Sequence, residues 1–198
     1  ILIFIFLAGT ATCAFNTYSI YKNRIDEKNL VIETNKQFEN RNFVSLTDAA
    51  IDFSHQGNTF KASADLKFIN KNKESINRYL FSLNSGLNVS RISSRGKDLT
   101  YTKTNHIVEI DPGKSLLPGE HDSIIISYSG NINESFCYPN YTDNIKKNPY
   151  RIQILNINKR QAFLTGNYVL LTPEAHWYPV PGLKIGTAHF RNPVKLIY

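Results

Sequence analysis

Two patterns of hydrophobic and polar positions divide the chain. Residues 1–21 carry no charged side chain, and the first fifteen, ILIFIFLAGTATCAF, are almost wholly apolar. From Phe43 the pattern changes, and apolar and polar residues alternate, most clearly over residues 60–68, FKASADLKF. Such alternation is typical of a β-strand with one buried and one solvated face. The chain is therefore predicted to begin with one apolar helix and to continue as a β-domain.

Turn residues cut the β-region into many short strands. Apolar residues in two phases between Val44 and Phe53 indicate a bulged strand, and residues 55–58, HQGN, indicate the hairpin turn after it. Further strands are predicted at 79–83, from 87 onward, and at 99–103, 106–110, 124–128, 152–157, 162–164, 168–171 and 194–198. No stretch after residue 43 shows a sustained helical period. The predicted fold is mainly β, an antiparallel β-sandwich or a pair of stacked sheets.

The apolar start of the chain has three interpretations. Residues 1–21 are predicted to form a truncated transmembrane helix, because crossing a bilayer takes about 20 predominantly apolar residues and Tyr18, Tyr21, Lys22 and Arg24 resemble an interfacial belt. A secretory signal peptide is the second interpretation, although its basic start is absent. A buried helix of a soluble domain is the third, and the lack of a polar face argues against it.

The domain boundaries follow from these patterns. Residues 22–42, KNRIDEKNLVIETNKQFENRN, are rich in charge and Asn, and their apolar residues are irregularly spaced. They are interpreted as a juxtamembrane linker with room for a short helix. The antiparallel β-domain is expected to cover residues 43–198. The chain starts without Met, so it is expected to be processed or a fragment, and its C-terminal strand is expected to be incomplete.

Charge and cysteine content exclude several classes of function. Lys and Arg number 23 against 16 Asp and Glu, a net charge of +7, and the basic residues are interleaved with acidic ones. This distribution does not indicate a nucleic-acid partner. Cys13 lies in the apolar helix and Cys137 in a loop of the β-domain, and no CxxC occurs. We therefore predict neither a cysteine zinc site nor a disulfide between the two.

The densest group of candidate functional residues lies at 170–182, LLTPEAHWYPVPG. Its prolines prevent regular strand pairing, which predicts a shaped loop after a strand. Trp177 and Tyr178 are interpreted first as packing residues that close one end of the sandwich, and second as a ligand surface. Glu174 is the candidate for binding an amine. None of the five histidines begins an HExxH motif, so no helical zinc site is predicted.

Two segments carry a resemblance to a known family. Residues 117–120, LPGE, precede the apolar strand 123–130, SIIISYSG. This L-x-P-G-E turn and strand resemble the N-terminal β-domain of M1-family (gluzincin) zinc aminopeptidases. Residues 166–168, GNY, together with 177–179, WYP, resemble the branch fused behind an ABC-2-type transporter permease. The resemblance covers residues 43–198 and implies a saddle-like β-domain.

The resemblance also implies where the chemistry would lie. In the family a separate domain carries the zinc motif and a G-x-M-E-N motif, and neither occurs in this chain, which has no Met. No cofactor is therefore expected here, and zinc is implied for the parent protein. The family's β-domain ends with a Gln or Glu that holds the substrate's amino group, ahead of A-R-x-x-F-P. Tyr178-Pro179 matches the Phe-Pro end without the Arg, and Glu174 is the nearest acidic candidate. Glu174, His176, Trp177 and Tyr178 are the candidate substrate-binding residues.

The leading hypothesis is a non-catalytic, membrane-tethered β-domain of an M1 aminopeptidase-like protein. It would pack against the downstream zinc domain in cis, wall one side of its substrate cleft and contact the peptide's N-terminus. The hypothesis further includes permease spans upstream, a membrane contact through residues 1–21 and an extracytoplasmic β-domain. Two alternatives stay open: a membrane-anchored module that binds peptide, glycan or a protein partner, and a structural extracytoplasmic domain of a transporter.

Overall fold

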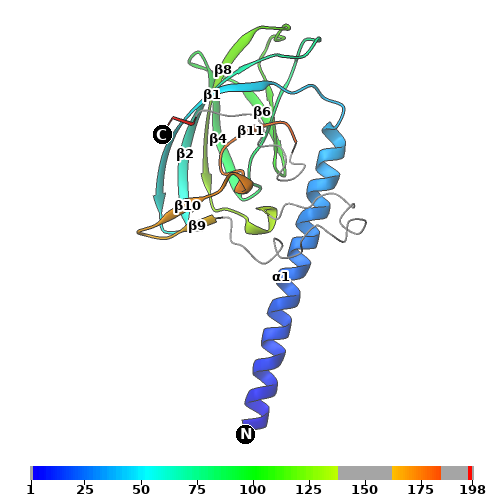
Figure 1. Cartoon of the computed structure of the whole chain (residues 1–198), viewed down its shortest axis with the longest axis vertical. Coiled ribbons are helices and arrows are strands. Elements are labelled where there is room, and N and C mark those ends of the chain that lie inside the picture. Colours follow the sequence, from blue (N-terminus) through cyan, green and yellow to red (C-terminus); the bar gives the residue numbers. More distant parts are fainter. Residues whose placement is uncertain (1, 138–161, 184–195, 198) are drawn as a thin grey trace, which may run out of the picture.

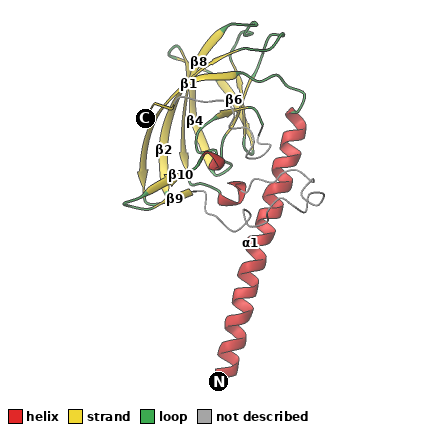
Figure 2. Cartoon of the chain, viewed as in Figure 1, coloured by secondary structure: helices red, strands yellow, loops and turns green. Residues whose placement is uncertain are grey.

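The computed structural model describes residues 2–137, 162–183 and 196–197 (Figure 1). One long helix precedes a β-domain, and most of the strands are short (Figure 2). The elements in chain order are α1 (Leu2–Phe38), β1 (Ser45–Gln56), β2 (Thr59–Ile69), β3 (Tyr79–Ser82), β4 (Leu87–Ser94), β5 (Lys97–Asp98), β6 (Thr100–Thr104), β7 (Ile107–Asp111), β8 (His121–Gly130), the 3₁₀ turn η1 (Glu134–Cys137), β9 (Ala162–Leu164), β10 (Val169–Leu171), the 3₁₀ turn η4 (Pro173–Ala175), β11 (Val180–Pro181) and β12 (Leu196–Ile197).

The strands form two main sheets and one hairpin. The larger sheet has the order β12-β1-β2-β8-β4-β5, the smaller one has the order β11-β3-β7-β6, and β9 pairs with β10. All pairs are antiparallel except β1 with β12, which is parallel. The mainly antiparallel β-fold expected from the alternation is thus confirmed. The strand expected at 152–157 lies outside the described residues.

The first hairpin has the bulge and turn that its sequence indicates. Leu46 pairs with Phe68, but the next pair joins Asp48 to Lys67, so β1 carries one extra residue. This bulge explains why the apolar residues of the strand change phase, since an extra residue shifts the alternation. Gly57 in the turn has a φ of 59°, a left-handed conformation that glycine adopts without steric cost.

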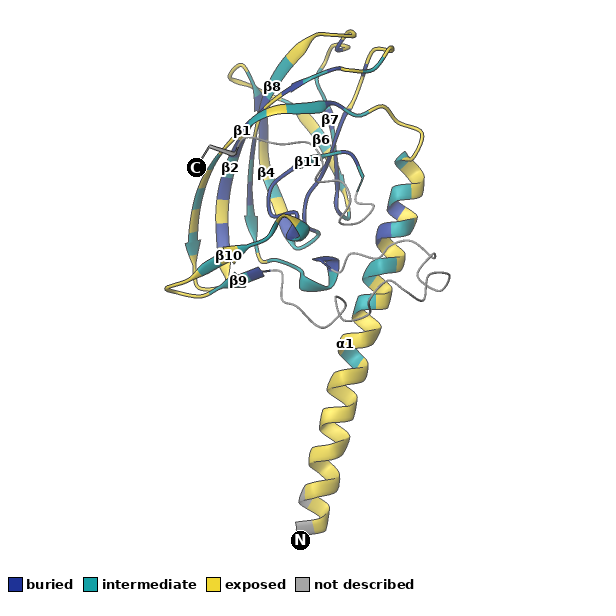
Figure 3. Cartoon of the chain, viewed as in Figure 1, coloured by how far each residue is buried: buried dark blue, intermediate teal, exposed yellow. Residues whose placement is uncertain are grey.

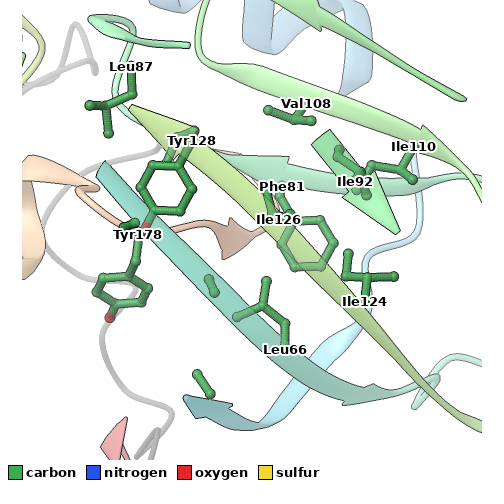
Figure 4. Close-up of a cluster of buried hydrophobic side chains, with 14 of the residues drawn as sticks. Leu66, Phe81, Leu87, Ile92, Val108, Ile110, Ile124, Ile126, Tyr128 and Tyr178 are labelled. Carbon is green, nitrogen blue, oxygen red and sulfur yellow. The ribbon is translucent and has the colours of Figure 1, made fainter. Parts of the chain in front are cut away.

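The hydrophobic core lies between the two sheets (Figure 4). The alternating apolar residues of β2 all point into it, and each is at most 7% exposed: Phe60, Ala62, Ala64, Leu66 and Phe68. In Figure 4, Leu66 and Ile126 of the larger sheet lie beside Phe81 of the smaller sheet. Full burial of such a side chain stabilises a fold by about 1.5–3 kcal/mol, so this shared face holds the sheets together.

Helix α1 is longer than the sequence analysis expected. The segment 22–42 is predicted to be a linker with room for a short helix, whereas in the structure α1 runs without interruption to Phe38. The reason is compositional: residues 22–38 contain no Gly or Pro, and Lys, Glu, Arg, Gln and Leu within them favour helix. The C-terminal part of the helix runs beside the β-domain and is partly buried, whereas the N-terminal part projects away from it (Figure 3).

The projecting part of α1 presents apolar side chains to the surroundings. Its exposed large residues are between 53% and 78% accessible: Ile3, Phe4, Phe6, Leu7, Phe15, Tyr18, Ile20 and Tyr21. The hydroxyls of Thr10, Thr12 and Thr17 donate to carbonyls four residues earlier at 2.8–2.9 Å, so the helix satisfies them internally. In the described part of the chain, no helix meets the combined length and apolarity that a bilayer crossing requires.

Candidate functional site

The candidate residues lie on one loop, residues 172–182, which we call the site loop. It leaves β10 through Thr172, and Pro173 opens the 3₁₀ turn η4, a position where proline's fixed φ and missing N–H suit a helix start. His176 ends the turn with φ 45° and ψ 44°, an uncommon left-handed conformation for a residue with a side chain. Its carbonyl accepts a hydrogen bond from the Asn84 backbone N–H at 2.9 Å. The strained position is thus held by contacts from outside the loop.

Asn84 joins the site loop to two other loops. Its side-chain Nδ2 donates to the Ala175 carbonyl at 2.8 Å and to the Asn133 carbonyl at 3.2 Å. Its Oδ1 accepts from the backbone N–H groups of Gly86 at 3.0 Å and Asn133 at 2.8 Å. The side chain is fully buried. One amide therefore ties together the loops around residues 84–86, 131–137 and 172–178.

Three of the four candidate substrate-binding residues are buried. His176 is 5% exposed, and its Nδ1 lies 3.1 Å from Ser82 Oγ. Trp177 is 6% exposed, and its ring meets Phe53 edge-on at 5.9 Å and Tyr178 at 5.1 Å. Tyr178 is 5% exposed and belongs to the same core. The interpretation of Trp177 and Tyr178 as packing residues is confirmed. The structure places these side chains in the interior, where they shape the loop.

Glu174 has a different environment from its neighbours. Of the four candidates it alone is partly exposed, and it sits at the centre of η4 directly before buried Ala175. The loop thus presents a carboxylate at its surface on a backbone that Asn84 and Pro173 fix. A carboxylate suits an ammonium group, because hydrogen bonds between ionised partners are the strong ones. The binding role of Glu174 remains a prediction.

Among the described residues, one buried hydroxyl of the core has no hydrogen-bond partner. Tyr128 is 2% exposed, and its Oη has no hydrogen-bond partner among the described residues. In Figure 4 its ring lies beside Tyr178. Burial, with a smaller contribution from Tyr178, raises the pKa of Tyr128 above its usual value of 10.0. The side chain therefore stays neutral in the folded protein through the physiological range.

The described residues contain no metal-binding cluster. No group of three His, Cys, Asp or Glu side chains lies close enough together there to hold a metal ion. Cys13 is exposed on α1 and Cys137 is buried in η1, and no disulfide joins the two. The described part of this chain thus gives no ligand set for the zinc that the resemblance implies for the parent protein.

Two residues that shape the site, Asn84 and His106, are not among the residues predicted from the sequence. Asn84 sits in Asn84-Ser85-Gly86, and this Asn-x-Gly turn signal was available in the sequence. His106 was considered only as a strand residue. It is fully buried, and its Nε2 lies 3.0 Å from Oδ1 of Asn35 in α1. A contact across 71 residues has no local sequence signal.

The fold resembles part of known zinc peptidases. One solved structure, a two-domain M1 zinc metallopeptidase mutant bound to L-arginine, matches with a TM-score of 0.50 and 17% identity. That match covers 69% of this chain and 28% of the other. An M1 zinc metallopeptidase from Deinococcus radiodurans matches 47% of this chain and 21% of its own, with 19% identity and a TM-score of 0.43. This chain therefore spans less than a third of the length of either.

The sequence comparisons were negative. No family profile matches the chain, and no curated protein matches it significantly. The likeness is therefore one of fold, and the match to the two-domain enzyme extends over about two thirds of the chain. The β-domain described here shares its fold with part of an M1 zinc metallopeptidase.

Proposed function

We propose that this chain contains the non-catalytic N-terminal β-domain of an M1 metallopeptidase-like protein. The observation that carries the proposal is the fold match to the two-domain M1 enzyme over 69% of the chain. In this proposal hydrolysis belongs to a separate zinc domain, against which the β-domain packs and whose substrate cleft it walls on one side. In the proposal, the part of this chain is to bind and orient the substrate.

Glu174 is the residue that would bind the free amino group of a peptide substrate. The site loop supports this role because Asn84 and Pro173 fix the backbone on both sides of the carboxylate. A held backbone lowers the conformational entropy that the loop would lose when its carboxylate binds an ammonium group. Two of the similar M1 structures are described as bound to L-arginine and to a Tyr-Ser-Ala substrate, which are ligands with a free amino group.

The test uses the parent protein in full length. Glu174→Gln keeps the size of the side chain and removes its charge, so KM for a peptide with a free amino group should rise more than kcat falls. The same substrate with an acetylated amino group should show no difference between the proteins. Glu33→Gln on the exposed face of α1 is the matched control. Unchanged KM in Glu174→Gln would exclude Glu174 as the amine ligand, and a parent with no peptidase activity and no HExxH motif would exclude the larger proposal.

The same proposal includes a membrane tether at residues 1–21 and permease spans upstream of it. What supports the tether is the exposure of Phe4, Phe6 and Phe15 on an uncharged helix whose threonine hydroxyls are bonded internally. Apolar side chains that cover all sides of a helix are stabilised by insertion into lipid. Lys22 and Arg24 follow at the position where headgroups would lie.

Co-sedimentation with phosphatidylcholine vesicles tests the tether. The chain should pellet with the vesicles, and a variant that lacks residues 2–21 should remain in the supernatant with its far-UV circular dichroism typical of β-structure. Equal partition of both proteins would contradict the tether. Several apolar spans in the coding sequence upstream would support the permease fusion, and their absence would contradict it.

A further inference from the structure

The C-terminal part of α1 packs on the β-domain through a stripe of mostly polar residues. We call residues 24–38 the docked segment. Its partly or fully buried positions recur at helical spacing, whereas the positions between them are exposed. The covered residues are Arg24, Glu27, Lys28, Val31, Ile32, Thr34, Asn35 and Phe38. The regular spacing shows that one face of the helix is committed to the domain.

Two polar contacts fix this face. Glu27 Oε1 accepts a hydrogen bond from Ser85 Oγ at 2.7 Å, next to Asn84. Asn35 Oδ1 lies 3.0 Å from Nε2 of His106, which is fully buried. Both contacts are partly buried, so breaking either one costs part of the free energy of a buried hydrogen bond. The helix is therefore held in one position and register.

An apolar contact continues from the docked segment toward the site loop. Val31 and Phe136 are both fully buried and pack together. The Phe136 ring lies 5.3 Å from the ring of His106 and 5.7 Å from the ring of His176. His176 directly follows Ala175, and Ala175 directly follows Glu174. The Asn84 side chain donates a hydrogen bond to the Ala175 carbonyl. Phe136 thus contacts the helix, His106 and the site loop.

We infer that the docked segment of α1 is a positioning element for the site loop, and that Val31 and Asn35 act on Glu174 through Phe136, His106 and His176. Undocking the helix would remove the packing of Val31 against Phe136. In a close-packed interior, the neighbouring side chains shift when such a contact is lost. His176 would then lose the packing of the Phe136 ring, one of the outside contacts beside its left-handed conformation, and the site loop would be held less firmly. Only the role given to Glu174 rests on the proposed function, since the packing of the helix against the loop is independent of it.

Trp177 reports on the loop directly. It is the only Trp of the chain, it follows His176, and it is 6% exposed. Its fluorescence therefore measures whether Trp177 stays buried in the site loop, and the measurement needs no substrate or activity. The decisive variant is Val31→Asp, because a carboxylate cannot stay buried against Phe136 without a partner and the helix must undock. Asn29→Asp, two residues earlier on the exposed face, introduces the same side chain in solvent and is the matched control.

The experiment measures acrylamide quenching of Trp177 in the whole chain, with far-UV circular dichroism as the control for the sheets. Val31→Asp should raise the quenching constant and shift the emission to the red while the β-signal persists, and Asn29→Asp should match the unmodified chain. Hydrogen exchange of residues 27–38 confirms undocking. Unchanged quenching in an undocked Val31→Asp chain would overturn the inference. Loss of the β-signal would overturn it too, because the segment would then be part of the domain core.

The peptidase readout separates this inference from the proposed function. If both hold, Val31→Asp should raise KM for a free-amine peptide in the full-length parent, in the same direction as Glu174→Gln. If Glu174→Gln has no effect while Val31→Asp still opens the loop around Trp177, the positioning role stands and the proposed role of Glu174 fails.

Discussion

Replacing Asn84 with alanine removes a side chain that four backbone groups share. The N–H groups of Gly86 and Asn133 and the carbonyl of Ala175 lose their side-chain partner, whereas the Asn133 carbonyl still accepts from the Phe136 N–H at 3.2 Å. A buried polar group left unpaired costs about 1–3 kcal/mol. Gly86 and Asn133 are only partly buried, so water can replace part of that loss. The expected cost is about 3–5 kcal/mol, a large share of the 5–15 kcal/mol typical of a domain.

The assay is urea unfolding of the whole chain, followed by far-UV circular dichroism and by Trp177 fluorescence. The Asn84→Ala midpoint should fall in both signals. Asn88→Ala is the control, because Asn88 is exposed four residues later on β4, and its effect should stay within about 0.5 kcal/mol. A difference below about 1 kcal/mol for Asn84→Ala, with the slope unchanged, would refute the conclusion that this amide connects the three loops.

Three further changes probe other parts of the fold. Trp177→Ala should cost about 3–5 kcal/mol in the same unfolding assay, because it empties a buried position against Phe53; an unchanged melting temperature would contradict the packing role. Tyr128→Phe should stabilise the fold by about 1 kcal/mol, because it removes a buried hydroxyl without a partner in the described residues. Because the pKa of Tyr128 is raised in the folded protein, this tyrosine ionises at lower pH in the unfolded chain, and the stability present below pH 10.0 is lost as pH rises above it. Tyr128→Phe should therefore lose less stability at alkaline pH in pH-dependent denaturation. The same dependence of stability on pH in both proteins would refute this. Gly86→Ala should lower the melting temperature, because its Cβ would clash with the Asn131 carbonyl, and a wild-type value would show that the loop can move aside.

The strands of the β-domain were predictable because their information is local. Alternation over residues 60–68 gave β2 and its buried face, and the phase change near Leu46 gave the bulge. The parallel pairing of β1 with β12 was not predictable, since it joins residues about 147 positions apart and no short-range pattern encodes it. Local pattern also could not decide which sheet each short strand would join.

The docked segment was misread for a specific physical reason. Hydrophobic periodicity finds a helix face only when the buried positions are apolar, and here Glu27, Thr34 and Asn35 occupy that face. Ile25 and Leu30 are apolar but 38% and 45% exposed, so the spacing of the apolar residues does not follow the buried face of the helix. At the candidate site, the loop and the burial of Trp177 were foreseen from its prolines and aromatics. The partners that hold the loop come from distant segments and were not.

The polar character of the docked segment has a consequence for synthesis of the chain on the ribosome. The helix is translated before its partners: Ser85 is 58 residues from Glu27, and His106 is 71 residues from Asn35. The segment must therefore wait in solvent until the β-domain has formed, since domains are completed in the order of translation. A stripe of Glu, Thr and Asn can remain hydrated during that interval, whereas an apolar stripe would invite premature association. The nascent helix can thus dock last, onto a surface that is already complete.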